Sequence, residues 1–378
     1  MDYLMNCTDI VMNNSSSSSF DNSTYSDREM IHKLDKMCNG VIIPVLCAFG
    51  FVGNILNVII FTQKKSSKIL DEVEYCTTIC LVALAISDMM FCFTTFPIAF
   101  LPAKWVFDNT EFMLYYKMYN TAIISTFIMS STLMTVLTAM MRYFAICHPF
   151  RSRQCITIRS TITAIVIAYL ISFAFNIPKL WRFKTTSLNN CLMIENLVLV
   201  KTGDLHKDKT FVYAYKILWA IFGNFIPLIV LLYCNIRLIK ALHMSKQLHL
   251  LHSRDDTSCL SAHRRINITL ITIIILFFIL VAPSEITKFI FYIMKEHDPE
   301  KYTYTFQVVS IVTNTLQSIN FSVNFILYYV IIAPFRKTLH EFVCAFSRPK
   351  RNTITRDRSS NSGKQTVVLL SIRDRNRL

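Results

Sequence analysis

Seven long apolar stretches constrain this chain of 378 residues more than any other feature. Each is long enough to cross a hydrocarbon core of about 30 Å as a helix that rises about 1.5 Å per residue. The stretches are residues 41–61, 76–101, 118–141, 160–178, 217–236, 266–287 and 306–333. They lack the polar stripe at helical spacing that a soluble bundle would show. We therefore predict an all-α membrane protein with a seven-transmembrane helix bundle over residues 41–333.

Charge within these stretches is limited to two acidic residues, Asp88 and Glu285. A charge inside a bilayer is costly and is retained mainly where it has a function, so both are candidate functional residues. A transporter or channel is the alternative from a different class. It would need more intramembrane charge or an internal repeat, and the two halves of the sequence show no obvious repeat.

The distribution of Lys and Arg indicates the orientation of the chain. Most of the 39 Lys and Arg residues fall in the segments 62–75, 142–159, 237–265 and 334–378. By the positive-inside rule these segments are cytoplasmic, which places the N-terminus outside a plasma membrane. No short apolar core with a cleavage site begins the chain, so the first span is expected to act as an uncleaved signal anchor. The net charge of +15 then indicates binding to anionic membrane lipid and partners at the inner face, not to nucleic acid.

Three further regions flank the predicted bundle. The tail 1–40 is polar and too poor in apolar residues to fold alone. Its Asn-x-Ser/Thr triplets predict glycosylation at Asn6, Asn13, Asn14 and Asn22. Residues 334–346 alternate apolar and basic side chains as an amphipathic interfacial helix does; Cys344 is a candidate for palmitoylation, and an unmodified cysteine is the alternative. Residues 347–378 are predicted to form a disordered cytoplasmic tail with Ser and Thr sites for kinases.

Short motifs occur one per span and in a fixed order. They are Gly53-Asn54, Leu84 to Asp88, Met141-Arg142-Tyr143, Pro227, Phe277 with Pro283, and Asn324 to Tyr328. In these motifs, residues 41–346 resemble the rhodopsin-like (class A) G-protein-coupled receptors. The last motif is similar to that family's Asn-Pro-x-x-Tyr, with Phe325 in place of proline. Within the class, Asn324-Phe325, Asn235 and Asn176-Ile177-Pro178 are similar to receptors of the FMRFamide and myosuppressin type.

This resemblance implies a receptor for an extracellular neuropeptide, short and amidated, that signals through a heterotrimeric G protein. Arrestin and a receptor kinase are further implied partners. A receptor for a lipid or other small molecule stays open as an alternative, and so does a constitutively active receptor. No nucleophile is paired with a base, and no phosphate loop or metal motif is present, so an enzyme is not expected.

In the resembled family, the position of Asp88 binds Na⁺ with help from the third and seventh spans. The matching residues here are Ser131, Asn320 and Asn324, which together supply oxygen ligands. The alternative is a protonated or water-bound carboxyl group without a specific ion. No other cofactor is expected.

The resemblance also implies a switch for G-protein coupling at the inner end of the third span. Its residues are Met141, Arg142, Tyr143, Asn235, Asn324 and Tyr328. In the family Arg142 would contact the G protein and Tyr328, whereas the alternative is an arginine that only anchors a helix end. The acidic neighbour that usually restrains the arginine is absent, because Met141 occupies that position. His263, Arg264 and Arg265 at the inner end of span six supply no acid either, so we predict raised basal signalling.

The ligand site is predicted from Glu285, Lys288, Gln317 and Ile124. Ile124 matches the acid of amine receptors, and Ser318 matches the retinal lysine of opsins, so neither a monoamine ligand nor retinal is expected. Glu285 is able to pair with an arginine of a peptide ligand. Helical spacing equally permits an internal pair with Lys288, and both interpretations stay open.

The disulfide of the outer face departs from the resembled family. That family links the outer end of span three to the second outer loop, but here Lys117 stands at the first position and only Cys191 of the loop is present. Cys38 is the preferred partner of Cys191, with Cys7 or a free thiol as alternatives. The sequence cannot show that the sulfur atoms approach each other.

Overall fold

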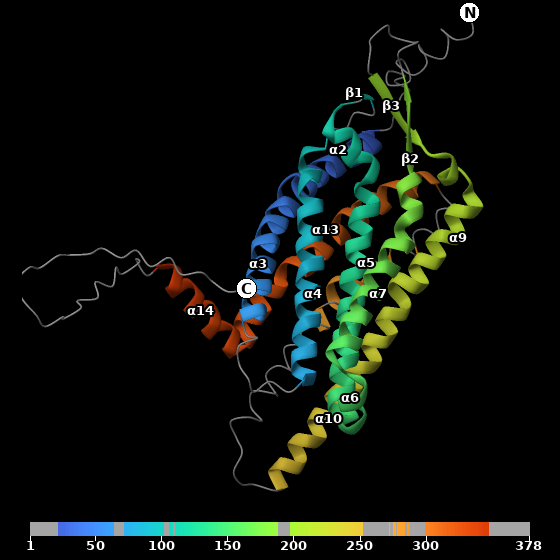
Figure 1. The fold of residues 1–378 in the computed structure, drawn as a ribbon. Coiled ribbons are helices and arrows are strands. Elements are labelled where there is room, and N and C mark those ends of the chain that lie inside the picture. Colours follow the sequence, from blue (N-terminus) through green and yellow to red (C-terminus); the bar gives the residue numbers. More distant parts are fainter. Residues whose placement is uncertain are drawn as a thin grey trace, which may run out of the picture.

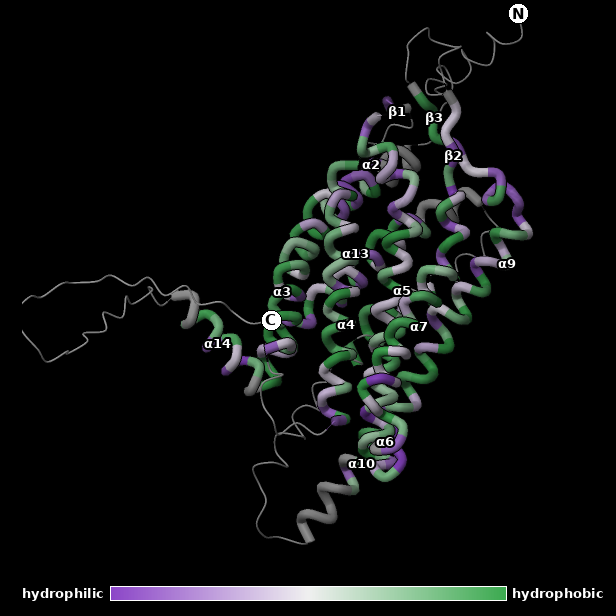
Figure 2. The backbone as a smooth tube through the Cα atoms, viewed as in Figure 1, coloured by the Kyte–Doolittle hydropathy of each residue, from purple (hydrophilic) through white to green (hydrophobic). Residues whose placement is uncertain are grey.

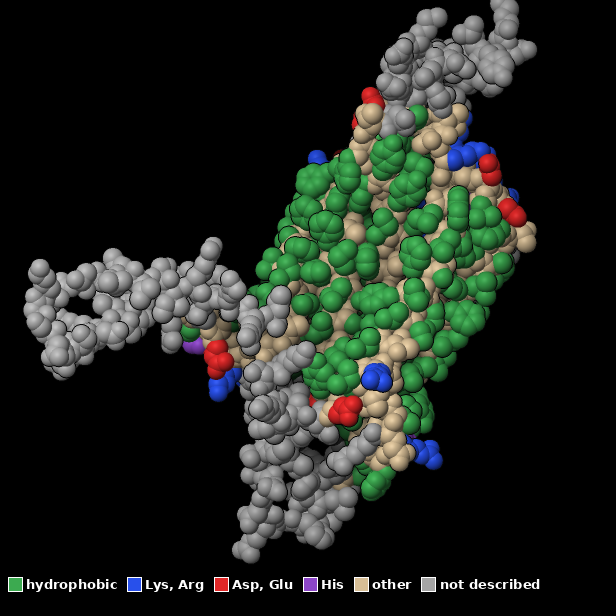
Figure 3. Space-filling view, in the orientation of Figure 1, with side chains coloured by type: hydrophobic (Ala, Val, Ile, Leu, Met, Phe, Trp, Pro, Cys, Tyr) green, Lys and Arg blue, Asp and Glu red, His purple; other side chains and the backbone are tan. Residues whose placement is uncertain are grey.

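The computed structural model describes residues 22–63, 72–101, 106–108, 110–187, 197–251 and 299–347, with short pieces between 272 and 290. These residues form an elongated bundle of helices with a small sheet at one end (Figure 1). Hydrophobic residues follow most of the helical length (Figure 2) and cover the visible flank of the bundle (Figure 3). An apolar flank of this extent is what lipid contact requires.

The main helices overlap the predicted spans, and several differ from them by six residues or more at an end, as α5 and α10 do. They are α3 Ile43–Gln63, α4 Glu72–Thr95, α5 Phe112–Cys147, α7 Ile158–Asn176, α9 Lys209–Ala220, α10 Ile226–Leu251 and α13 Pro299–Ile331. Among the described residues, five helical stretches are long and apolar enough to cross a membrane. A sixth candidate is Thr305–Ile331, which is bent by 95° from the following Phe335–Cys344. The all-α prediction is confirmed, while most of the predicted span 266–287 lies outside the described residues.

Prolines coincide with changes in helix type along the spans. The π-helical turns Cys38–Ile42 and Ile221–Phe225 end two residues before Pro44 and Pro227. The 3₁₀ turns Phe96–Phe100 and Ile177–Trp181 contain Pro97 and Pro178. Proline lacks a backbone N–H and its ring clashes with the carbonyl one turn earlier. The helix therefore widens or tightens at these points.

The N-terminal tail is more ordered than its composition predicts. Residues Asn22–Met37 form helix α2, which continues through the turn Cys38–Ile42 into α3 and packs against α13. The sequence predicted that the tail would not fold alone. Helix α2 forms because it packs against the bundle. Of the predicted glycosylation sites, Asn22 begins α2, and the other three lie outside the described residues.

The outer face carries a three-stranded antiparallel sheet in the order β1-β3-β2. Its strands are β1 Val106–Asp108, β2 Phe183–Ser187 and β3 Leu197–Thr202. Phe107 of β1 and Val198 and Val200 of β3 bury their side chains against Leu114 of α5. The predicted second outer loop, residues 179–216, thus contains a hairpin that covers the outer end of the bundle.

On the inner face, the short helix α6, Pro149–Cys155, follows α5. After the seventh span, α14 Ala333–Ser347 forms where the amphipathic helix was predicted. Its Phe335 is buried against Phe61 of α3 and Tyr328 of α13. Cys344 is partly exposed on α14, but its palmitoylation stays a prediction.

Helices α3 and α13 approach each other closely. The Nδ2 atom of Asn54 donates to the backbone oxygen of Phe321 at 3.0 Å. A Cβ atom added at Gly53 would lie 2.9 Å from Cβ of Phe325, so the glycine makes room for this side chain. Helix α13 continues unbroken through Asn324 to Tyr328, because Phe325 keeps the N–H that proline would lack.

Candidate functional site

Asp88 is fully buried at the centre of the bundle, where three helices meet. Its Oδ1 atom accepts a hydrogen bond from Oγ of Ser131 on α5 at 2.5 Å. Its Oδ2 atom accepts one from Nδ2 of Asn324 on α13 at 2.6 Å. Together these bonds connect α4, α5 and α13. Two of the three residues predicted around Asp88 are therefore in direct contact with it.

The third predicted residue, Asn320, is buried one turn earlier on α13. Within the described part of the chain, no hydrogen bond joins it to Asp88. The carboxylate of Asp88 and the hydroxyl of Ser131 supply hard oxygen atoms of the kind that bind hard cations. Asn324 would have to turn its Oδ1 atom inward to contribute. No group of three His, Cys, Asp or Glu side chains gathers among the described residues.

Tyr169 of α7 contacts α4 next to this centre. Its hydroxyl lies 2.7 Å from Oγ of Ser87 and donates to the backbone oxygen of Ala83 at 2.9 Å. These bonds hold the residue beside Asp88 in position. Sequence reasoning missed Tyr169, although a hydroxyl within an apolar span is a signal that a polar partner lies nearby.

Arg142 lies at the inner end of α5 with only 7% of its surface exposed. Its Nε atom is buried and has no hydrogen-bond partner among the described residues. The adjacent Met141 faces α4, where its Sδ atom lies 3.5 Å from Sγ of Cys80. The arginine that was expected to face the cytoplasm is therefore held between helices with its charge only partly compensated.

Glu74 supplies an acid that the sequence analysis did not find. It lies in the first turn of α4, and its carboxylate interacts electrostatically with Arg142 without reaching ion-pair distance. The predicted second span began at residue 76, which left Glu74 in a loop. Helix α4 instead begins at Glu72, and this earlier start brings the acid beside the helix bundle. The two positions that the sequence analysis considered, Met141 and the inner end of span six, still lack an acid, so Glu74 is a further group that can restrain Arg142, and raised basal signalling stays a prediction.

The other predicted switch residues occupy separate positions. The hydroxyl of Tyr143 lies 3.1 Å from Nε2 of His148 and 3.4 Å from the hydroxyl of Tyr233 on α10. Asn235 of α10 is buried, and within the described part of the chain its Oδ1 atom has no hydrogen-bond partner. Tyr328 packs edge-on against Phe61, with ring centroids 5.1 Å apart. Among the described contacts, none joins Tyr328 to Arg142.

The predicted ligand site is described only in part. Ile124 packs beside the buried aromatic pair Phe91 and Phe321. Gln317 lies one turn before Phe321 on α13; it is buried, and its Nε2 atom has no hydrogen-bond partner. An unsatisfied amide on the outer half of the bundle is the kind of group that a ligand can engage. Glu285 and Lys288 lie outside the described residues.

Lys117 occupies the position where the resembled family has a cysteine, and its side chain has a structural role there. Its side chain is largely buried, and its Nζ atom lies 5.2 Å from the ring centroid of Phe107 in β1. This cation–π contact connects α5 to the outer sheet. Cys38 is a buried free thiol and so gives no support to the predicted pairing with Cys191, which lies outside the described residues.

Comparison with known proteins agrees with this arrangement. The model of the 7 transmembrane receptor (rhodopsin family) matches residues 53–328. An FMRFamide receptor of Drosophila melanogaster is 24% identical over 341 residues, which cover 87% of this chain and 58% of that receptor. Galanin receptor 2a of Danio rerio is 25% identical over 349 residues, covering 89% and 86% of the two chains.

Melanopsin-A of Danio rerio is 24% identical over 211 residues, covering 55% of this chain and 33% of that protein. The chain thus spans less than two thirds of the FMRFamide receptor and of melanopsin. The family itself consists of receptors rather than enzymes. Since the family model extends from the first described span to Tyr328 in the last, the chain belongs to the rhodopsin family of seven-transmembrane receptors.

Proposed function

We propose that this chain is a plasma-membrane receptor, with its N-terminus outside, that binds an extracellular ligand and activates a heterotrimeric G protein. The observation that carries the proposal is Arg142, which is buried at the inner end of α5 with its Nε atom unpaired. A buried polar atom without a partner costs about 1–3 kcal/mol. A rearrangement that gives Arg142 a partner would recover this cost, and a docking G protein can supply the acceptors.

A second unpaired atom indicates where the bundle rearranges. Oδ1 of Asn235 is a buried acceptor on α10, and α10 packs directly against α5, which carries the donor on Arg142. Movement of the inner end of α10 can join these complementary groups. Ligand binding would favour this arrangement through its differential affinity for the two states. Asn324 and Tyr328 would transmit the change, because α13 contacts both Asp88 and the inner aromatic cluster.

We propose a short amidated neuropeptide as the ligand. Support comes from the Asn324-Phe325 and Asn235 motifs and from the similarity to an FMRFamide receptor. A lipid or other small molecule remains the second candidate, because the described outer half is largely apolar. Arrestin and a receptor kinase are proposed partners for the Ser- and Thr-containing residues 347–378, as is Na⁺ for Asp88.

The test is a screen of amidated peptides against cells that express the chain, with calcium and cAMP readouts and empty-vector controls. A peptide ending in Arg-Phe-amide is expected to activate the receptor, and its non-amidated form to be weaker. Activation by lipids alone would overturn the peptide assignment but leave the receptor function intact. Absence of any G-protein response, basal or stimulated, from surface-expressed protein would overturn both.

Glu285 provides the sharper test of how the peptide is recognised. Glu285→Gln should right-shift an arginine-containing agonist about tenfold or more, because a desolvated charge pair with the ligand is lost. The same peptide with citrulline in place of arginine should shift much less. Lys288→Gln is the matched control, since an internal Glu285–Lys288 pair would make both variants shift both peptides in parallel.

A further inference from the structure

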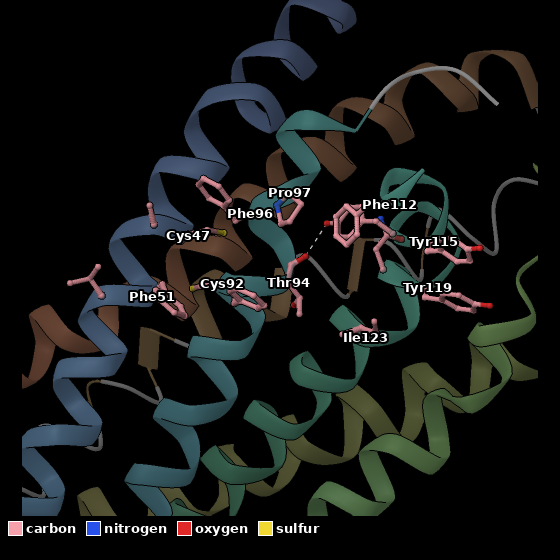
Figure 4. A pocket seen from close by; sticks show the side chains of 15 residues that line it. Cys47, Phe51, Cys92, Thr94, Phe96, Pro97, Phe112, Tyr115, Tyr119 and Ile123 are labelled. Carbon is pink, nitrogen blue, oxygen red and sulfur yellow. Dashed lines mark hydrogen bonds between the residues drawn. The ribbon is translucent and has the colours of Figure 1, made fainter. Parts of the chain in front are cut away.

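Helix α5 separates two different environments at the outer end of the bundle. On one side, aromatic residues such as Phe112 and Tyr119 face α3 and α4 across an apolar crevice (Figure 4). On the other side, α5 packs against the 3₁₀ turn Ile177–Trp181, which packs in turn against the 3₁₀ turn Asp204–His206. Basic side chains gather on this second side, which belongs to the outer loop.

Three basic residues, Lys179, Arg182 and Lys216, form what we refer to as the outer basic cluster. Lys179 lies in the first 3₁₀ turn, Arg182 directly follows that turn, and Lys216 lies on α9, which packs against the second turn. Burial and then the charges of all three residues lower the pKa of His206 in the second turn. The three charges therefore act on one common point at the outer face.

Arg182 is held in place by both its backbone and its side chain. Its backbone oxygen accepts a hydrogen bond from Gly203 at 2.9 Å, and a Cβ atom added at Gly203 would collide with the backbone oxygen of Trp181. The exposed guanidinium lies 5.2 Å from the ring centroid of Phe183, and its Nη1 atom donates to Oγ1 of Thr121 on α5 at 3.4 Å. A group that is positioned in advance loses little freedom when it binds a ligand.

The side-chain contacts of Arg182 within the described part of the chain carry no negative charge, since they are a phenyl ring and a hydroxyl group. The described acids of the same loop have other partners. Asp204 accepts hydrogen bonds from Lys184 and Lys207, and Asp208 accepts from backbone N–H groups at the start of α9. A carboxylate from outside the chain is the group that complements this guanidinium, because its two oxygens match the guanidinium fork.

Arg182 lies beside the predicted ligand site. Its partner Thr121 is one helical turn from Ile124 on α5, and Ile124 packs beside Phe91 and Phe321 in the outer half of the bundle. A carboxylate held by Arg182 can therefore belong to the molecule that fills the ligand site. The cluster also repels the arginine of an Arg-Phe-amide peptide, so the amidated end of such a peptide lies elsewhere in the site.

We propose that the outer basic cluster binds the carboxylate of an acidic residue that the peptide agonist carries on the N-terminal side of its amidated end. Arg182 is the direct partner of this carboxylate, and Lys179 and Lys216 add electrostatic attraction. The inference rests on the proposed peptide function and adds a second recognition element to it. The agonist is accordingly a peptide with an acidic residue at one end and an amide at the other.

Lys179 connects the cluster to the outer end of span five. Its Nζ atom lies 4.5 Å from the ring centroid of Trp219, and Nε1 of Trp219 donates to Oδ1 of Asn176 on α7 at 3.3 Å. Trp219 lies directly before the π-helical turn Ile221–Phe225, from which α10 continues. A bound carboxylate competes with the indole ring for the ammonium group, so binding would loosen a contact at the base of this helix.

The test uses the full-length chain at the cell surface and pairs of synthetic peptides. Each peptide is Phe-Met-Arg-Phe-amide, extended at its N-terminus by up to three glycines and then by Asp, and each has a twin with Asn in place of Asp. On wild type, the Asp form at the best spacing is expected to be about tenfold more potent than its twin, because it gains a charge-assisted bond. Arg182→Gln should reduce this advantage to within about twofold.

Two further variants separate a specific contact from general surface charge. Arg182→Lys should keep part of the advantage, because it retains the charge but not the planar fork. Lys209→Gln is the matched control, since Lys209 is an exposed cation in the first turn of α9 and is not a member of the cluster. It should leave the advantage of the Asp peptide unchanged. Surface expression is measured for every variant.

A second measurement needs only the wild-type protein. Raising the ionic strength with N-methylglucamine chloride at constant Na⁺ should reduce the advantage of the Asp peptide about twofold or more, because salt screens exposed charges. An advantage that is insensitive to salt, that persists in Arg182→Gln, or that is missing at every spacing while the peptides still activate the receptor overturns this inference alone. Failure of every peptide to activate wild type overturns the peptide assignment and this inference with it.

Discussion

Two charged residues are buried in the bundle, Asp88 at its centre and Arg142 at its inner end. They differ in how fully their polar atoms are paired by hydrogen bonds. Both oxygens of Asp88 accept short hydrogen bonds, one from each of two neighbouring helices. Among the described residues, Arg142 has an unpaired Nε atom, and the acid Glu74 acts on its charge from beyond ion-pair distance. A fully paired charge fixes the helices that surround it, whereas an incompletely paired charge favours any rearrangement that completes its contacts.

The contrast assigns different tasks to the two positions. Asp88 sets which helix arrangement is stable, because moving α13 breaks its bond from Asn324. The contacts of Arg142 at the cytoplasmic end depend on that arrangement, and a partner can reach the arginine there. A protein that switches between two states needs both a fixed centre and an incompletely paired end. If every part of the helix bundle were held equally tightly, no second arrangement would be populated.

Removing the incompletely paired charge should have the largest effect. Arg142→Ala is expected to reduce basal and peptide-stimulated nucleotide exchange on the G protein at least about tenfold, because the group offered to the partner is lost. Exchange would be measured in membranes at matched surface expression. Arg151→Ala is the control, because Arg151 is exposed on α6. Equal activity of both variants would show that Arg142 only anchors the helix end.

Removing the carboxylate of Asp88 should abolish the response to Na⁺ but leave coupling to the G protein. In wild type, replacing K⁺ by Na⁺ at constant ionic strength is expected to weaken agonist binding about fivefold or more, because Na⁺ would favour the inactive packing. Asp88→Ala should remove the Na⁺ response, and Asp88→Asn should do so while keeping the side-chain shape. Radioligand competition in the two salts measures this. A persistent Na⁺ response in both variants would exclude the Asp88 site.

Removing the restraint that Glu74 places on Arg142 should have a smaller effect. Glu74→Gln is expected to raise basal signalling several-fold, because a partly exposed charge interaction is worth up to about 1 kcal/mol. Met141→Asp should lower basal signalling by a similar factor by adding a nearer acid. Glu72→Gln is the matched control, as it lies in the same first turn of α4. An equal change from Glu72 and Glu74 would indicate general surface charge instead of a specific restraint.

The features that could be predicted are those set by local chemistry. Bilayer thickness and apolar length identified the spans, and the family motifs identified Ser131 and Asn324 as neighbours of Asp88. Glu74 was missed because the polar first turn of α4 looks like a loop in sequence. The contact of Lys117 with Phe107 joins α5 to a sheet whose register no local pattern encodes. Helix α2 depends on packing against α13, far away in sequence.

The outer face repeats the contrast between paired and unpaired groups, and pH can separate them. Asp204 accepts hydrogen bonds from Lys184 at 2.7 Å and Lys207 at 3.2 Å, and these bonds lower the pKa of its carboxyl group. His206 is partly buried with Nδ1 unpaired, and burial, aided by the charge of Arg182, lowers the pKa of its imidazole. The stabilising effect at Asp204 is lost only as pH falls below its ordinary value of 3.8. Between pH 7.5 and 5.5, His206 is therefore the group that titrates differently in the two states.

Because the pKa of His206 is depressed in the folded loop, the opened loop binds a proton first as pH falls through the ordinary value of 6.5. The folded outer loop should therefore be less stable at pH 5.5 than at pH 7.5. The amide of Gly203, which donates to the oxygen of Arg182 at 2.9 Å, should exchange about two- to threefold faster at pH 5.5 after correction for intrinsic rates. His206→Gln should remove this pH dependence, and Asp204→Asn should retain it. The same pH dependence in His206→Gln would place the titrating group elsewhere and leave the contrast between Asp88 and Arg142 without a counterpart at the outer face.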